Sequence, residues 1–353
     1  MKTLFLPTTP LHAFFALGLM RGPFRDHQHT LALISRLDDT PDHIADALQD
    51  SVSSGVTVVR FPKLKGVGPA RRLLGEISAC ARAIEPSMIA VGNDRRTEFY
   101  AAVRGCPSAR RIYLDDGLHS YLPHHDVQSA WRRALDVTRR RLRYGLPVER
   151  PPMIGGSRAV QEAYVLLPQQ VHEGLRGKPV QPLQPSWFAD PWVRGICTAA
   201  ASLAGLDTSL CRSIGLLLLL PHPRFLESYP VLRQQIEALA ARHAERGELV
   251  ALKAHPWAGL PLARQLKVPL HSVLELPARL PVEVLVPLLS GTLVVGSLTT
   301  ALLSLALLGE HLTVHSLLPP ATPGAEGDNN DRTLNIYRSV GIHPFDLRAI
   351  SLA

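Results

Sequence analysis

Short apolar runs alternate along the chain with longer segments of helical pattern. In the first part of the chain the apolar runs cover residues 3–9, 30–35, 55–62, 87–93 and 110–117. The segment at residues 70–85 lies between two of these runs and repeats its apolar positions at helical spacing. Short apolar runs bounded by turn residues predict buried strands. Strands that alternate with helices predict a parallel sheet with helical crossovers.

The same alternation begins again near Cys211. Strands are predicted at residues 213–222, 248–256 and 291–297, and helices at residues 230–246 and 298–309. Between the two parts, residues 145–190 are rich in Pro and Gly, so regular structure is expected to be sparse there apart from a strand at 163–169. The sequence therefore predicts an α/β protein of two doubly wound halves, with the strand ends of both lining a cleft.

The composition is that of a globular protein. With 353 residues, 46% of them apolar, the chain can form two domains of about 100 to 200 residues each. Its cysteines are Cys80, Cys106, Cys197 and Cys211. They form no C-x-x-C pair and no zinc-like spacing, which argues against a disulfide framework or a metal knuckle and favours a reducing cytoplasm.

The amino-terminal segment at residues 1–22 is the one stretch with some features of a targeting signal. Pro7, Pro10 and His12 interrupt its apolar run and no small-residue cleavage site follows, so we interpret it as strand, loop and helix. No later stretch reaches the roughly 18 unbroken apolar residues that a membrane span requires. We therefore expect a soluble, cytoplasmic protein.

The net charge of +8 is concentrated in one helical segment. Its arginines are Arg132, Arg133, Arg139, Arg140, Arg141 and Arg143. Such a cluster attracts anions without sequence specificity, so we expect a peripheral contact with anionic inner-membrane lipid or a polyanionic acceptor; the alternative is a solvated helix face. Nucleic acid is not expected as a partner, because the chain lacks a zinc-finger spacing, a helix-turn-helix and interleaved stacking aromatics.

Two adjacent carboxylates interrupt the predicted strand that begins at Arg110. The apolar run stops at Leu114, and Asp115, Asp116 and Gly117 follow directly. Strands are depleted in Asp and Gly, so these residues belong at the carboxyl end of the strand. In open α/β sheets this end is where ligands bind.

Two further stretches place polar groups at the ends of predicted strands. Lys253 and His255 alternate along the strand that precedes Pro256 and so point the same way, either as part of a site or as a basic pair that caps the strand. In the second stretch a helix start follows the strand that ends at Gly296. It carries Ser297, Thr299 and Thr300 and suits an anion such as phosphate, although a plain helix cap by Ser297 would explain it too.

Taken together, these motifs resemble those of the bacterial sialyltransferases, in particular the polysialyltransferase-like group. The shared features are an acidic pair followed by Gly, a His-Pro pair and paired hydroxyls, here Asp115-Asp116-Gly117, His255-Pro256 and Thr299-Thr300. The amino-terminal FLPTTPLHAFFALGL also resembles the Thr-Pro-Leu opening of these families, where a first strand leads into a helix beside the acceptor pocket. The resemblance runs from about residue 3 to residue 310 in the same order.

This resemblance implies a GT-B fold, in which two Rossmann-like doubly wound domains face a central cleft. The implied domains are residues 1–205 on the acceptor side and 206–335 on the CMP-sugar side, with a terminal segment, 336–353, that packs back on the first domain. It also implies an inverting transfer of sialic acid or a related nonulosonic acid from a CMP-activated donor to a glycan hydroxyl of bacterial surface polysaccharide. The resemblance implies neither a metal nor a cofactor.

The resemblance also assigns roles to single residues. Asp115 is the implied general base, supported by Asp116, and His255 is the implied general acid or phosphate ligand. Lys253 is expected to contact the phosphate and Glu283 to hold the cytidine ring. The remaining implied positions are Pro256, Ser297, Thr299 and Thr300 on the donor side and Thr9, Pro10 and Gly117 on the acceptor side.

Three alternatives stay open at this point. Asp115, Asp116, His119, His124 and His125 carry the ligand types of a metal site. The chain could also be a non-catalytic GT-B partner in envelope polysaccharide assembly. The third alternative is a transferase for another nucleotide sugar, such as a CMP-Kdo or a UDP-sugar enzyme. The position of Glu283 favours a cytidine nucleotide.

Overall fold

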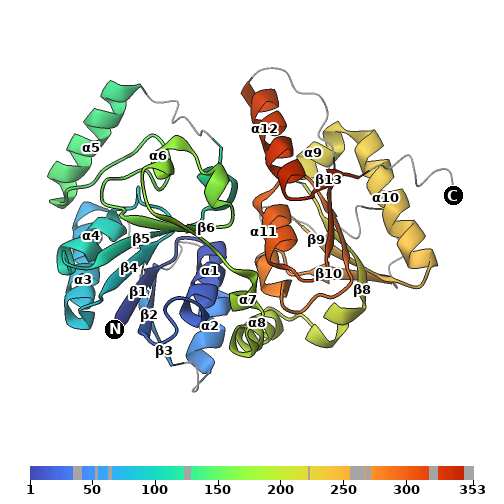
Figure 1. The fold of residues 1–353 in the computed structure, drawn as a ribbon, viewed down its shortest axis with the longest axis horizontal. Helices are drawn as coiled ribbons and strands as arrows, with labels where there is room; N and C mark the ends of the chain where they lie inside the picture. Colours follow the sequence, from blue (N-terminus) through green and yellow to red (C-terminus); the bar gives the residue numbers. More distant parts are fainter. Residues whose placement is uncertain are drawn as a thin grey trace. The chain divides into compact units, whose positions relative to one another are not determined.

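A computed structural model describes most of the chain, and it divides into two compact units, Met1–Ile196 and Cys197–Ala353 (Figure 1). The described residues are 1–34, 42–51, 55–62, 66–122, 129–221, 223–254, 266, 272–317 and 325–345. The division falls inside helix α8 (Pro191–Leu203), close to the domain boundary predicted after residue 205. None of the helices among these residues is long and apolar enough to cross a membrane.

The first unit is built on a parallel sheet with the strand order β3-β2-β1-β4-β5-β6-β7. Its strands are β1 (Lys2–Leu6), β2 (Gln28–Ile34), β3 (Val56–Phe61), β4 (Met88–Val91), β5 (Arg110–Leu114), β6 (Glu162–Val165) and β7 (Val180–Pro182). The inner strands are buried on both faces, as expected of a parallel sheet covered by helices. The structure therefore confirms the strands predicted from the apolar runs.

Helices connect these strands and cover the sheet (Figure 1). They are α1 (Pro10–Arg21), α2 (His43–Asp50), α3 (Val67–Ile84), α4 (Thr97–Gly105), α5 (Ala130–Tyr144), α6 (Glu173–Arg176) and α7 (Pro185–Phe188). The chain leaves β1 toward β2 and β3 on one side, and β4 then lies on the other side of β1. The strand order thus reverses between β1 and β4, and a ligand crevice is expected at the carboxyl ends of these two strands.

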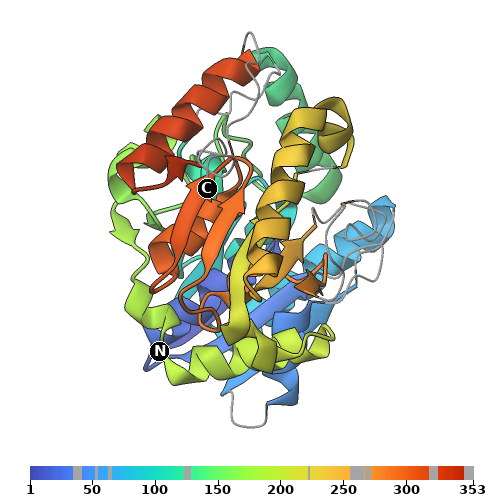
Figure 2. The same cartoon turned by 90° about the vertical axis from the view of Figure 1, so that its right-hand side faces the viewer.

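The second unit has its own parallel sheet, with the order β10-β9-β8-β11-β12-β13. Its strands are β8 (Ile214–Leu219), β9 (Leu249–Lys253), β10 (Val273–Leu276), β11 (Leu293–Gly296), β12 (Thr313–Ser316) and β13 (His343–Pro344), and its helices are α9 (Pro223–Ser228), α10 (Pro230–Glu245), α11 (Thr300–Leu308) and α12 (Ala325–Ser339). Helix α10 packs along β8 and β9 (Figures 1 and 2). The strand order reverses between β8 and β11.

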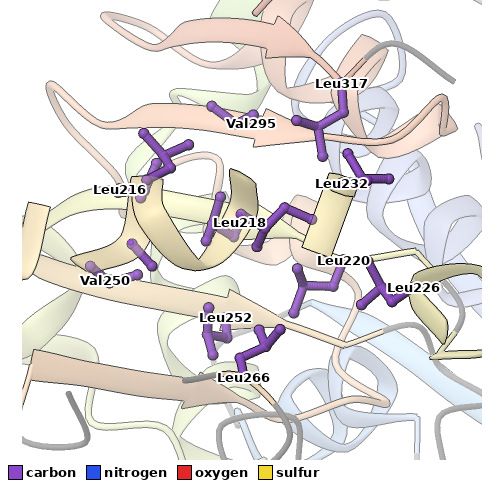
Figure 3. Close-up of a cluster of buried hydrophobic side chains, with 13 residues drawn as sticks. Leu216, Leu218, Leu220, Leu226, Leu232, Val250, Leu252, Leu266, Val295 and Leu317 are labelled. Atoms are coloured by element: carbon purple, nitrogen blue, oxygen red, sulfur yellow. The ribbon is translucent and has the colours of Figure 1, made fainter. Parts of the chain in front are cut away.

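Aliphatic side chains of the sheet and of α10 form the core of the second unit (Figure 3). Leu216 and Leu218 from β8 meet Val250 and Leu252 from β9, and Leu232 adds the contact from α10. A fully buried aliphatic side chain contributes about 1.5–3 kcal/mol to folding. The run of leucines at residues 216–220 therefore serves the core of the unit, which leaves the polar residues at the strand ends for other tasks.

The last described residues of the chain belong to the second unit. The fully buried Tyr337 lies in α12, and β13 pairs in parallel with β12, so residues 336–345 belong to this unit. Residues 346–353, the rest of the predicted terminal segment, lie outside the described residues.

Candidate active site

The acidic pair, Asp115 and Asp116, lies at the carboxyl edge of the first sheet, directly after β5. A short 3-10 turn follows at Gly117–Ser120, and Gly117 has a φ of +66°. Glycine adopts this left-handed conformation without the steric cost that a side chain brings. The sequence Asp-Asp-Gly thus ends the strand and turns the chain where a ligand crevice is expected.

Asp115 is fully buried and stabilises this turn by accepting hydrogen bonds. One carboxylate oxygen accepts the Gly117 N–H at 2.8 Å and the Ser120 hydroxyl at 2.7 Å. The other accepts the Leu166 N–H at 2.7 Å and the Tyr121 hydroxyl. Burial raises the pKa of the Asp115 carboxyl to about 6, although these donors favour its charged form. Both oxygens are therefore occupied in joining the turn to the end of β6.

Asp116 is the more accessible member of the acidic pair. Its side chain retains 14% of its accessible surface, and its Oδ1 lies 3.0 Å from Nε2 of the fully buried His12. The two atoms are at ion-pair distance without the alignment of a hydrogen bond. The backbone N–H of Asp116 donates to the Ser120 hydroxyl at 3.1 Å, which fixes the residue to the turn that Asp115 organises.

His12 lies in the first turn of α1, at the reversal point of the sheet. The hydroxyls of Thr8 and Thr9 lie 2.9 and 3.0 Å from its Nδ1, and Thr9 is the N-cap of the helix, with Pro10 at its first position. Gly92, directly after β4, packs against the ring: a Cβ there would lie only 2.2 Å from the imidazole. The structure thus joins the predicted Thr9 and Pro10 to the acidic pair through a histidine.

Sequence reasoning missed both His12 and Gly92. The signal for His12 was present, because an imidazole in the apolar helix PLHAFFALGLM is a buried polar group that requires a partner. Nothing in the sequence identifies Asp116 as that partner, since the two residues are brought together only by the neighbouring positions of β1, β4 and β5 in the sheet.

At the carboxyl edge of the second sheet, the charged side chains of Lys253 and Glu283 interact electrostatically. Lys253 ends β9, is 8% exposed, and donates to the carbonyl oxygens of Ala278 at 2.7 Å and Ala254 at 3.3 Å. Burial lowers the pKa of Lys253 to about 8, and the nearby charge of Glu283 opposes this shift. Burial also raises the pKa of Glu283, which lies in the turn Val282–Leu285. The structure thus brings together two of the residues predicted for the donor side.

The paired hydroxyls lie on the same edge of the second sheet as Lys253. Lys253 is in register with Leu219 of β8, which is in register with Gly296 at the end of β11. Two inter-strand spacings place these strand ends about 10 Å apart. A Cβ on Gly296 would lie 2.6 Å from that of Leu219, so only glycine permits this close approach.

The start of α11 is capped by Thr299. Its hydroxyl accepts the Ala301 N–H at 3.4 Å, and its own N–H donates to the hydroxyl of Tyr337 at 2.8 Å. The alternative of a cap by Ser297 is therefore wrong, because Ser297 precedes the cap residue. The backbone N–H groups of Thr299 and Ala301 are thus both used within the protein.

Several predicted residues lie outside the described part of the chain. They are His255 and Pro256 from the His-Pro motif, and His124 and His125 from the alternative metal site. His119 lies in the turn Gly117–Ser120. Among the residues that the structure describes, no group of three or more His, Cys, Asp or Glu side chains is arranged to hold a metal ion.

No protein-family model matches the sequence. No curated protein matches it at a significant level either.

The fold, in contrast, matches solved structures over nearly the whole chain. An α/β-galactoside α-2,3-sialyltransferase from Photobacterium phosphoreum superposes with a TM-score of 0.59 at 11% identity, covering 99% of this chain and 98% of that chain. The GT-B domain of a sialyltransferase from Photobacterium damselae gives 0.55 at 11% identity, covering 97% and 98%. The UDP-GlcNAc 2-epimerase of Methanocaldococcus jannaschii also gives 0.55 at 11% identity, covering 96% and 92%.

These similarities confirm the predicted GT-B fold, with a doubly wound parallel sheet in each of the two units. At 11% identity they establish the fold alone. A transferase and an epimerase share this architecture, so the function has to be argued from the residues at the two sheet edges.

Proposed function

We propose that the protein is a glycosyltransferase that moves a sugar from a nucleotide-activated donor to a glycan hydroxyl. The observation that carries this proposal is the chemistry at the two sheet edges. The first unit presents a partly exposed carboxylate, Asp116, and the second presents a buried cation, Lys253. A carboxylate can take the acceptor proton, and a cation can stabilise the leaving phosphate.

The proposed donor is a CMP-activated nonulosonic acid such as CMP-sialic acid. The resemblance of the motifs to bacterial sialyltransferases supports this, as does the carboxylate of Glu283 close to Lys253. A carboxylate accepts from the exocyclic amine of cytosine, whereas uracil offers a carbonyl at that position. The proposed acceptor is a glycan of bacterial surface polysaccharide.

The proposed reaction is an inverting displacement. The acceptor oxygen attacks the anomeric carbon from the face opposite the leaving nucleotide, and an acid of the acidic pair takes its proton. Lys253 and His255, with Ser297, Thr299 and Thr300 at the start of α11, are proposed to meet the charge that develops on the phosphate. Since side chains could supply this stabilisation, we propose that the reaction requires no metal.

The proposed cellular location is the cytoplasm, at the periphery of the inner membrane. Helix α5 supports the lipid contact: it has no buried residue and lies on the outside of the first unit (Figure 1). Trp131, Leu135 and Leu142 are 63%, 39% and 77% exposed and fall on one helical face. Arginines flank this apolar stripe, which is the pattern of a helix that lies in an anionic membrane interface.

A second candidate function is chemistry on a UDP-sugar. The observation that favours it is the fold, which matches the epimerase from Methanocaldococcus jannaschii as well as it matches one of the sialyltransferases. The third candidate, a non-catalytic partner in polysaccharide assembly, would bind a glycan without turning over a nucleotide sugar.

The deciding experiment follows nucleotide release from CMP-sialic acid and from a panel of UDP-sugars, with and without glycan acceptors, in excess EDTA. Glycan-dependent release of CMP is the expected result. Release or epimerisation with UDP-sugars alone would favour the second candidate, and no turnover with any donor would favour the third. Activity that disappears in EDTA and returns with a divalent ion would overturn the metal-free mechanism.

A further inference from the structure

The two acids of the acidic pair differ in what they can still do. Asp115 accepts four hydrogen bonds from the protein and is sealed from solvent. To take a proton from an acceptor it would have to give up part of this network, on which the turn depends. Asp116 accepts no hydrogen bond from the described residues; its Oδ1 lies 3.0 Å from Nε2 of His12, and its side chain is 14% exposed. Asp116 is therefore the acid of the pair whose carboxylate is available to take a proton from an acceptor.

The neighbours of His12 indicate which of its two ring nitrogens carries the proton. The Thr9 hydroxyl accepts the backbone N–H of His12 at 3.4 Å, so its own proton is available for Nδ1, which lies 3.0 Å away. The Thr8 hydroxyl lies 2.9 Å from the same nitrogen. If Nδ1 accepts from these hydroxyls, the neutral ring carries its proton on Nε2, the atom that lies 3.0 Å from Asp116 Oδ1.

We propose that Asp116 is the residue that takes the acceptor proton and that His12 is the positioning residue that orients its carboxylate. This inference rests on the proposed function and names the base within it. The hydroxyls of Thr8 and Thr9 contact Nδ1 of His12, and the missing side chain of Gly92 leaves the room that the imidazole occupies. Such packing fixes a group within the narrow limits that catalysis requires.

In the step itself the acceptor oxygen forms a bond to the anomeric carbon of the donor. The bond from that carbon to the phosphate oxygen breaks, and its electron pair leaves with the nucleotide. The acceptor proton passes to Asp116, whose second oxygen stays directed by His12. Solvent exposure of Asp116 lets this proton leave after the transfer, and Asp115 keeps the turn in place throughout.

The test compares Asp116→Asn, His12→Ala, His12→Gln and Gly92→Ala with the wild type. Asp116→Asn is expected to lower kcat about a hundredfold or more, the usual contribution of a positioned base. His12→Ala is expected to lower kcat about tenfold, with little change in the KM of the donor. His12→Gln should recover part of this loss, because its amide can donate to Asp116.

Gly92→Ala keeps both reacting side chains and displaces the ring of His12, so it tests position alone and is expected to resemble His12→Ala. The matched control is His29→Gln, a buried histidine near the amino end of β2, the opposite edge of the same sheet. It should leave kcat within about twofold of the wild type. Melting temperatures of all variants separate loss of fold from loss of activity.

A measurement that needs no turnover separates this inference from the proposed function. In ¹⁵N-histidine NMR spectra His12 should be protonated at Nε2, and Asp116→Asn should shift that nitrogen more than Nδ1. An active wild type with a nearly unaffected Asp116→Asn or His12→Ala would overturn the inference. If no donor is turned over, the proposed function fails. In that case, a His12 Nε2 chemical shift that Asp116→Asn leaves unchanged would overturn the contact between His12 and Asp116, and a changed shift would support it.

Discussion

Tyr337 holds the start of helix α11 through both backbone groups of Thr299. Its hydroxyl accepts the Thr299 N–H at 2.8 Å and donates to the Thr299 carbonyl oxygen at 2.6 Å. The ring is fully buried in α12, and burial raises the pKa of its hydroxyl. Residues far apart in the sequence thus fix the position of the paired hydroxyls.

Tyr337→Phe should therefore destabilise the second unit. The substitution removes both hydrogen bonds while keeping the ring, so the free energy of unfolding is expected to fall by about 1–3 kcal/mol. Chemical denaturation measures this. Tyr144→Phe, at the carboxyl end of the exposed helix α5, is the matched control and should change stability by less than about 0.5 kcal/mol. Equal changes in the free energy of unfolding for the two substitutions would show that the Tyr337 hydroxyl does not stabilise the protein.

Asp115→Asn tests whether this carboxylate is structural. An amide places an NH₂ group where the carboxylate accepted donors, so at least one buried donor loses its partner. We expect the free energy of unfolding to fall by about 2 kcal/mol or more. A variant with unchanged stability, intact donor binding and no transfer would instead identify Asp115 as the base, as the family resemblance implies.

The buried ammonium of Lys253 should make nucleotide binding depend on pH. Its pKa of about 8 lies below the ordinary value because of burial, and a bound phosphate would favour the charged form. Affinity for CMP is therefore expected to fall as the pH rises through about 8, by at most about tenfold per pH unit. Calorimetric titrations at pH 7 and pH 9.5 measure this, and Lys253→Met should bind weakly at both. A pH-independent affinity would argue against contact between Lys253 and the phosphate.

The buried ammonium of Lys253 should also affect the stability of the nucleotide-free protein, which is expected to rise as the pH rises. Its pKa in the folded protein lies below the ordinary value of about 10.4, so between about pH 8 and pH 10 the unfolded chain binds more protons than the folded one. The free energy of unfolding of the nucleotide-free protein should consequently gain a contribution that increases with pH over this range. Lys253→Met should lack this gain, and its persistence in the variant would assign it to other groups.

The sequence predicted β1 to β6 of the first sheet and β8, β9 and β11 of the second, most of which are apolar runs buried in the sheet. It did not predict the short, less buried strands β7, β10, β12 and β13. Residues 112–114 of β5 and 250–252 of β9 are buried apolar examples, and the position of Asp115 and Lys253 at the carboxyl edges followed from where these runs end. This part of the fold depends on local composition, which one chain reveals directly.

The contacts of the site could not be predicted in the same way. Asp115 and Asp116 are adjacent and chemically identical, and only the tertiary structure distinguishes them: Tyr121 and Leu166 occupy the first, whereas the second meets His12. The role of Tyr337 likewise depends on where α12 packs. Long-range pairing decides such contacts, and the pattern of a single sequence carries no information about it.

Glu283 should determine the base preference of the nucleotide site. CMP is expected to raise the melting temperature more than UMP at equal concentration, because only cytosine offers an amine to the carboxylate. Glu283→Gln should remove most of this difference, since an amide can both accept and donate. Equal stabilisation of the wild-type protein by CMP and UMP would contradict the assignment of cytidine and favour a transferase for another nucleotide sugar.

Helix α5 should bind anionic membranes through its apolar stripe as well as its charge. Vesicles that contain an anionic lipid should bind the wild-type protein and shift the fluorescence of exposed tryptophan to shorter wavelength, because Trp131 enters the interface. Replacing Arg139, Arg140 and Arg141 with Gln should weaken this binding and its salt dependence, at about 1 kcal/mol for each arginine that lies near the surface.

Leu142→Ala separates insertion from charge attraction, because it leaves every arginine in place. It should weaken vesicle binding at high salt, where the electrostatic attraction is screened and the apolar contact remains. Val231→Ala is the matched control, since Val231 on α10 is 66% exposed and belongs to the other unit. Both variants should bind CMP like the wild type. Vesicle binding that survives the three arginine substitutions unchanged would make α5 a solvated helix face.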